Sequence, residues 1–554
     1  MEKRDCISRF IVRRLSRRHA IGFAARAGLG LAGATLLGCA AAPAPTRAPA
    51  PAATKATTPT AKQLDKLVLG HNGDIATLDP TYDTGIIPGL PFLYMVYDGL
   101  TRWSRDLKSS PHLAVSWEVP DERTWIFKLR TGVKHHNGYD FEAEDVKFTV
   151  ERALDPETKS QAVRLVRSID KAQVVDPVTA KITTKVPDPL LSKLMGDVLV
   201  YSHRYLKEQG KDILATKPVG TGAWRFVKWV KDDYVELAAT DSHFSIGKPP
   251  IKQYIQRPIP STAPRLAALL TGEADVIYSI NSDEWERVEK TPDLGIVYAN
   301  IHASFPHFGM SQFGDSPFKD KRVREAVNLA IDREGINKAL WKGKALVLGQ
   351  PANPGCFGYD ETIKPYPYDP KRAKELLTQA GYPNGFETKL YKSYPTYPQD
   401  KEYNEAIMGY LRDVGIRLQL VEWTLAQRTF LQEQVAANKG PEGIFNMYGW
   451  CGAAVEVGGV FDSHIVKFDP KAMLGNKGWW FDPEVERLGL EARVTMDAEK
   501  RKELYNKMLR RIREEHYWIP LFTTLYTWGH NKKKIKAMYP RWGWMHSMWD
   551  IDVA

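Results

Sequence analysis

The first 63 residues constrain the fold most, because no part of them can join a packed core. An uncharged run of 11 residues from Ala27 to Leu37 follows the pair Arg17 and Arg18. This length fits the roughly 7–15 apolar residues of an export signal and falls short of the roughly 20 that span a membrane. Residues 40–60 are almost entirely Ala, Pro and Thr, a composition that cannot bury a core. We predict an export signal over 1–38, a semi-extended tether over 39–63 and a folded chain from about residue 64.

The leader also carries two motifs that indicate where the mature protein resides. Leu36-Leu37-Gly38-Cys39 resembles a lipobox, in which Cys39 is lipidated and becomes the new N-terminus, and Ser16-Arg17-Arg18 resembles a twin-arginine signal. An ordinary basic signal cleaved at one of the alanines is the alternative. We expect a protein in the periplasm or on the outer face of the cytoplasmic membrane, held there by a lipid anchor.

Length, charge and cysteines narrow the class further. About 490 residues follow the tether, which is more than one core accommodates and enough for two or three domains. The formal charge of +11 arises largely in the leader, whose 38 residues hold eight Lys/Arg and two acids, so the mature chain gives no support for a nucleic-acid partner. Cys356 and Cys451 remain after the leader, either as one disulfide or as two buried thiols.

Hydrophobic periodicity predicts both helices and strands. Residues 125–129 alternate apolar and polar as a strand does, and residues 145–154 place apolar side chains at helical spacing before Pro156. Residues 407–414 form a helical pattern that ends at Gly415, after which a strand pattern begins. Such units indicate an α/β chain with sheets covered by helices.

The sequence lacks the motifs of the common enzyme classes. A G-x-G-x-x-G string at residues 28–33 lies inside the leader with no strand before it, and no P-loop, HExxH helix, GxSxG elbow or paired CxxC occurs. His135 and His136 are adjacent, so their side chains point to opposite sides of an extended segment and do not form a metal site. We therefore predict no catalytic residue, no metal and no cofactor.

Eight blocks of sequence together resemble the extracellular solute-binding proteins of family 5, which serve ABC importers of dipeptides, oligopeptides and nickel complexes. The blocks occur in the family's order over residues 64–554. They comprise Leu113–Glu118, Trp125–Lys134, His136–Phe148, Pro218–Trp224, Ser316–Arg333, Tyr368–Tyr382, Val421–Trp423 and Trp518–Leu521.

This resemblance implies an α/β fold of the type II periplasmic-binding-protein kind, with two lobes joined by a hinge and an extra domain inserted in the first lobe. Ligand binds between the lobes, and hinge closure buries it. By analogy, lobe one comprises residues 64–102, 217–303 and 528–554. The inserted domain comprises 103–216, and lobe two comprises 304–527.

The resemblance also points to a ligand segment at residues 447–456. It is similar to a family segment, G-W-x-G followed by an Asp-rich stretch, in which one aspartate holds a peptide's α-ammonium. Here Glu456 aligns with that aspartate, and the other acidic positions hold Ala or Val. We expect Glu456→Gln to weaken binding of an amine-bearing ligand at least about tenfold and to leave the unfolding temperature nearly unchanged.

Aromatic and polar residues complete the predicted site, since aromatic faces supply contact area and hold cations. Tyr82 and Asp83 follow the first strand, in a segment that faces the cleft in relatives. The predicted ligand residues are Tyr82, Asp83, Trp423, Arg428, Tyr448, Trp450, Cys451, Gly452, Ala453 and Glu456.

The function expected from this resemblance is capture of a peptide or peptide-sized solute for an ABC permease, by a monomeric lipoprotein without chemistry of its own. The permease and ATPase are separate chains. Within the same fold, the altered acidic stretch favours a sugar, an opine, a metal chelate or a heme-like compound as the alternative ligand. An exported lipoprotein enzyme and a chaperone-like envelope protein are the alternatives from other classes.

Overall fold

The computed structural model describes residues 63–82, 89–103, 108–299, 304–393, 399–423, 440–449, 455–464, 480–540 and 551–554. The chain separates into two compact units, Met1–Pro59 and Thr60–Ala554, and every described residue belongs to the second. The predicted export signal and the lipid site at Cys39 lie outside the described residues.

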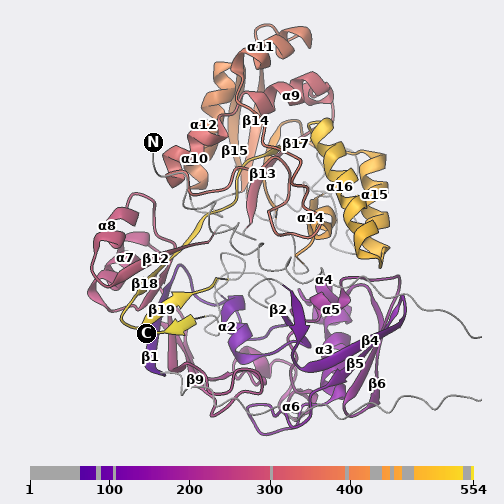
Figure 1. Cartoon of the computed structure of the whole chain (residues 1–554), viewed down its shortest axis with the longest axis vertical. Coiled ribbons are helices and arrows are strands. Elements are labelled where there is room, and N and C mark those ends of the chain that lie inside the picture. The colour runs from indigo at the N-terminus through magenta and orange to yellow at the C-terminus, as the bar shows by residue number, and fades with distance from the viewer. Residues whose placement is uncertain are drawn as a thin grey trace, which may run out of the picture. The chain divides into compact units, whose positions relative to one another are not determined.

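A seven-stranded sheet gathers strands from both ends of the folded chain (Figure 1). Its central strand β1 runs parallel to both neighbours, β10 and β11, and the second half of β1 is mostly buried, as expected for an inner strand. Helices α2 (Gly89–Val96), α7 (Thr262–Thr271) and α8 (Trp285–Lys290) pack against it. In spatial order the strands are β12 (Leu294–Ala299), β18 (Tyr526–Asn531), β11 (Val276–Tyr278), β1 (Leu64–His71), β10 (Ile251–Pro258), β9 (Tyr234–Ala239) and β8 (Trp224–Val230).

A five-stranded sheet is built from the second half of the chain. Its order is β15 (Ile416–Trp423), β14 (Phe386–Ser393), β16 (Ile444–Gly449), β13 (Phe305–Met310) and β17 (Trp518–Pro520). Figure 1 shows α15 and α16 side by side, in agreement with their mutual contacts. The helices of this region are η3 (Pro317–Lys319), α9 (Lys321–Leu329), α10 (Arg333–Trp341), α11 (Pro370–Gln379), α12 (Asp400–Asp413), α14 (Val457–His464), α15 (Pro483–Val494) and α16 (Ala498–Glu514).

The predicted helix, glycine stop and strand in this region are confirmed. Helix α12 buries Ile407 and Leu411, and β15 begins at Ile416. Gly415 between them has φ +99°, a left-handed conformation that favours glycine. Gly385 packs so closely that a Cβ there would lie 1.9 Å from the Gly415 carbonyl oxygen, so both glycines are sterically required.

A four-stranded antiparallel sheet forms from residues 114–184, in the order β4 (Ala114–Asp121), β5 (Thr124–Leu129), β7 (Thr179–Thr184) and β6 (Ile169–Asp176). Trp125, Phe127 and Leu129 are buried, as their alternation predicts. Helix α3 (Ala143–Leu154) ends before Pro156, and a capping box between Glu142 and Asp145 fixes its start. The short helices here are η1 (Pro156–Thr158), α4 (Val163–Val166), α5 (Leu191–Leu194), α6 (His203–Gln209) and η2 (Ile213–Ala215).

Two short strand pairs complete the described structure, β2 (Thr101–Trp103) with β3 (Ser109–Pro111) and β19 (Ile535–Met538) with β20 (Ile551–Val553). The strands of the three larger sheets group along the chain much as the predicted lobes and inserted domain do, and β18 begins slightly before the expected boundary at 528. The domain boundaries themselves stay a prediction. One apolar cluster joins Leu269 and Trp285, beside the seven-stranded sheet, to Val327 and Leu411, beside the five-stranded sheet.

Candidate functional site

The carboxyl ends of three parallel strands meet at one edge of the five-stranded sheet. Strand β14 lies between β15 and β16 and runs parallel to both. The three strands end at Ser393, Trp423 and Gly449. Ligands of open α/β sheets bind outside the carboxyl ends of such strands. Trp423 and Tyr448, two predicted ligand residues, therefore belong to strand ends at the same edge.

The remaining predicted residues of this region follow these strand ends along the chain. They lie outside the described residues, and for Trp423 and Tyr448 the structure describes the backbone only. Their contact with a ligand stays a prediction, although the sheet order brings both sequence segments to one place. The predicted residues outside the described part are Asp83, Arg428, Trp450, Cys451, Gly452 and Ala453.

Tyr82 is half-buried and its ring lies against a cation of the protein. The guanidinium of Arg152 lies 5.7 Å from the ring centroid and donates to Asp79 at 2.8 Å. Asp79 is fully buried and accepts from the Thr81 N–H at 2.8 Å, which closes a turn after β1. Burial by itself lowers the pKa of Arg152, yet the hydrogen bond to Asp79 helps to raise that pKa above its ordinary value. Arg152 thus lies within cation–π distance of Tyr82.

Glu456 is a predicted ligand residue whose side-chain partners include described residues. Its side chain is fully buried, and its Oε1 lies 2.6 Å from Lys193 Nζ. Arg501 is the second cation, with Nε 3.2 Å from Oε2 and Nη2 3.4 Å from Oε1. The carboxylate therefore already binds an ammonium group, which belongs to Lys193 on α5. Its role toward a ligand amine stays a prediction.

The backbone around Glu456 is tightly constrained. Phe357 accepts from the Val457 N–H and donates to the Val455 carbonyl, both at 3.0 Å. Val455 has φ +52°, a rare conformation for a β-branched residue that costs about 1–3 kcal/mol and persists only where surrounding contacts enforce it. Cys356, next to Phe357, is disulfide-bonded, and its partner cysteine lies outside the described residues. These contacts hold Glu456 in one place.

A second acidic residue on the same segment has a matching arrangement. Asp462, on α14, lies 2.6 Å from Arg167 Nη2 and also pairs with Arg493 of α15. Arg167 directly follows α4, near the four-stranded sheet. Burial is the main cause that lowers the pKa of Arg167, and Arg493 lowers it further while Asp462 opposes the shift. Both acids are thus shared between cations from two regions.

Asp98, His112 and His243 form a different buried cluster whose side-chain types suit a metal ion. Among the described residues, these three bring ligand atoms within 4.8 Å of one another. His112 Nε2 lies 2.8 Å from Asp98 Oδ1, and His243 Nε2 lies 3.3 Å from Asp98 Oδ2. Thr221 donates to Asp98 Oδ2 at 2.7 Å.

The hydrogen bonds of this cluster favour a structural network over a metal site. His243 Nδ1 accepts from the Ser245 N–H at 3.2 Å, so in the neutral ring Nε2 carries the proton and donates to Asp98. A metal-bound histidine has the opposite arrangement, in which the second ring nitrogen donates. Burial alone raises the pKa of Asp98, yet His112 and His243 hold it well below its usual range. We interpret the cluster as a satisfied buried carboxylate.

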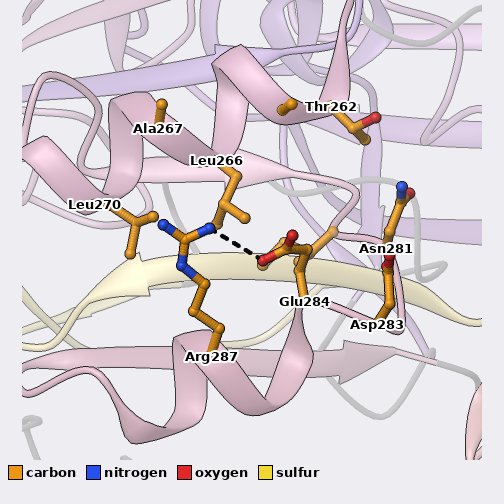
Figure 2. A pocket seen from close by; sticks show the side chains of 10 residues that line it. Thr262, Leu266, Ala267, Leu270, Asn281, Asp283, Glu284 and Arg287 are labelled. Atoms are coloured by element: carbon orange, nitrogen blue, oxygen red, sulfur yellow. Dashed lines mark hydrogen bonds and ion pairs between the residues drawn. The ribbon is translucent and has the colours of Figure 1, made fainter.

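A separate pocket lies beside α7 and α8 and contains none of the predicted ligand residues. Its volume is about 290 Å³, and Leu266, Leu270 and Ile280 form its apolar part. Figure 2 shows Arg287 and Glu284 paired at its wall, with Oε2 and Nη1 3.4 Å apart. An exposed pair of this kind contributes little energy, and the other polar residues of the lining are Thr262, Asn281 and Asp283.

Comparison with known proteins identifies the family. The model of the bacterial extracellular solute-binding proteins, family 5, matches residues 108–459, which is more than half of the chain. The chain belongs to this family. Membership confirms the predicted resemblance and the prediction that this is a binding protein and not an enzyme.

Curated relatives and solved structures extend the similarity beyond the matched residues. The glutathione-binding protein GsiB of Pectobacterium atrosepticum is 29% identical over 491 residues, which cover 88% of this chain and 94% of GsiB. DppA of Helicobacter pylori, solved with the peptide STSA, is 24% identical with a TM-score of 0.71 and covers 89% of this chain and 98% of DppA. NikZ of Campylobacter jejuni, solved with Ni(L-His), is 24% identical with a TM-score of 0.72, over 86% and 96% of the two chains.

These structural matches confirm the mixed α/β fold of this family-5 member over nearly its full length. No helix in the described part of the chain is both long and apolar enough to span a bilayer. For the site, the family resemblance led to Glu456 but gave no sign of its cations. Lys193 lies 263 residues away in sequence, and no spacing rule links the two.

Proposed function

We propose that this family-5 protein captures a peptide or peptide-sized solute and delivers it to an ABC permease, with the ATPase on separate chains. The main supporting observation is that β14, β15 and β16 end at the same edge of the sheet. This edge holds the strand ends to which the predicted aromatic residues Trp423 and Tyr448 belong. The chain's similarity to GsiB and to peptide-bound DppA supports a ligand of this size.

We propose that the solute contacts Trp423, Tyr448 and the segment 450–453, with Arg428 available for a carboxylate. Aromatic faces at a strand edge supply broad apolar contact and tolerate varied side chains. We propose that Tyr82 and Asp83 contact the solute as well; Tyr82 follows β1 of the seven-stranded sheet in sequence, and its ring lies near the Arg152 guanidinium. Binding between the two sheets would couple ligand capture to hinge closure.

A non-peptide solute is the second candidate, and Glu456 favours it. Its carboxylate is buried and already paired with two cations, so it does not stand open for a peptide ammonium. NikZ, solved with Ni(L-His), has this fold and binds a metal chelate. A sugar, an opine, a metal chelate or a heme-like compound would need no ammonium site.

A thermal-shift screen of residues 61–554 distinguishes the two candidates, because a ligand that binds only the folded state raises the unfolding temperature. The panel comprises di- to hexapeptides, their N-acetylated forms, glutathione, sugars, opines and nickel chelates. Stabilisation by peptides supports peptide capture. A response to non-peptide compounds alone would replace the first candidate by the second.

We further propose that the protein is a monomer, anchored through Cys39 in the periplasm or on the outer face of the cytoplasmic membrane. Cys39→Ser should release it from membranes without changing solute affinity, since it removes the site of lipid attachment and none of the predicted ligand residues. Fractionation of cells that express each form measures this. Persistent membrane association of the variant would contradict lipidation at Cys39.

A further inference from the structure

Two acids at α14 each bind one cation from their own region and one from the region of the four-stranded sheet. Glu456 pairs with Arg501 of α16 and with Lys193 of α5. Asp462 pairs with Arg493 of α15 and with Arg167 after α4.

The two cations on Glu456 are held with unequal firmness. Arg501 has a side chain that is 6% exposed, and its Nη1 donates to the carbonyls of Thr495 at 2.9 Å and Met496 at 3.1 Å. Lys193 has a side chain that is 26% exposed and ends at Glu456 Oε1 and the face of Phe357, 5.6 Å from the ring centroid. Arg501 is therefore a fixed partner, whereas the Lys193 ammonium can move to solvent.

Burial decides how an external amine could reach this carboxylate. Glu456 has a fully buried side chain, and of its two described cationic partners Lys193 has the more exposed side chain. A solute ammonium that approaches from solvent must therefore displace Lys193. The solute ammonium then gains the ion pair that Lys193 loses, but it gives up its own hydration and competes with an ammonium that the fold already holds at the carboxylate.

From these contacts we propose that Lys193 is a specificity-determining residue, a built-in ammonium that occupies Glu456 and selects for solutes without a free amine at this point. This inference rests on the proposed capture of a peptide-sized solute and names the chemical class that the site accepts. N-blocked peptides and peptide-like compounds carry no amino-terminal ammonium that competes with Lys193 for Glu456. Free amino termini compete with the protein's own lysine.

The test measures affinity for one peptide in two forms, Ser-Thr-Ser-Ala with a free and with an N-acetylated amino terminus. Titration calorimetry on wild type should show the acetylated form bound at least as tightly as the free form. Lys193→Met leaves Glu456 with one cation and should shift the ratio of the two affinities about tenfold or more toward the free peptide. Lys193→Arg keeps the charge and should preserve the wild-type ratio.

Lys134→Met is the matched control, because Lys134 also belongs to the region of the four-stranded sheet but pairs at 2.6 Å with Asp140 on the surface. It should leave the ratio unchanged. An unchanged ratio in Lys193→Met, or a wild-type preference for the free peptide above tenfold, would overturn the role of Lys193. Failure of both forms to bind wild type would instead overturn peptide capture itself, and the wild-type titration alone reveals that outcome.

Discussion

Asp98 and Glu456 are both buried carboxylates with two basic partners, yet the structure uses them differently. Asp98 binds His112, His243 and Thr221, all of which are nearly fully buried. Glu456 binds one fixed arginine and one partly exposed lysine. The partners of Asp98 have no route to solvent, whereas one partner of Glu456 does. The comparison teaches that burial of the acid does not decide its role; the exposure of its partners does.

The largest expected effect tests the structural role of Asp98. Asp98→Ala should lower the free energy of unfolding by about 3–5 kcal/mol. The variant leaves the buried side chains of His112, His243 and Thr221 without the carboxylate that they bind. Urea denaturation measures the loss. Asp140→Ala, which removes an exposed partner of Lys134, should cost at most about 1 kcal/mol. Wild type dialysed against EDTA should keep its unfolding temperature, and a drop that zinc restores would revive the metal interpretation.

Glu456→Gln should be destabilising as well, by about 2–3 kcal/mol, because it leaves Lys193 and Arg501 without their counter-charge. The sequence alone led to the expectation of a nearly unchanged unfolding temperature, and the two ion pairs change that expectation. Thermal and urea unfolding of the variant decide between the two. A variant as stable as wild type would mean that the Lys193 contact is weak.

Acidification should affect the two sites differently, because Lys and Arg do not titrate between pH 5 and 8 whereas His does. Burial lowers the pKa of His112, so the unfolded chain binds a proton there that the folded chain does not. Stability is therefore full above about pH 6.5 and falls as the pH drops, by about 1.4 kcal/mol per unit until the folded pKa is reached. Hydrogen exchange at pH 7 and pH 5 should show lost protection around residues 98 and 112 before any loss around 456.

The smallest expected effect concerns the ion pairs that join the region of the four-stranded sheet to the region of α14, α15 and α16. Spin labels at Val175→Cys and Leu490→Cys, both exposed, report the distance between the four-stranded sheet and α15. The double variant Lys193→Met and Arg167→Met loses one ion pair to Glu456 and one to Asp462. In unliganded protein it should reduce the fraction of molecules with a short distance between the labels by about threefold, because partly exposed ion pairs contribute little energy. A distance distribution that stays the same would show that these pairs do not hold the regions together.

Much of the local structure could be predicted because it depends on neighbours in the chain. Helix α12, Gly415 and β15 follow from periodicity and one required glycine, and the burial of Trp125, Phe127 and Leu129 follows from alternation. The family could also be recognised, because its sequence blocks are spread from Leu113 to Leu521. The ligand site stays a prediction, and the alignment that led to Glu456 gave no sign of Lys193 and Arg501.

The sequence by itself determined the α/β class, the family and the type of function, since these depend on local patterning and on motif order. Only the tertiary structure decided that Lys193 and Arg501 meet at Glu456, and that Asp98 gathers two histidines. These contacts join residues far apart in sequence, through sheets and helices that must first pack. Whether a buried acid is open to a ligand depends on which charges reach it, and that is fixed by packing in three dimensions.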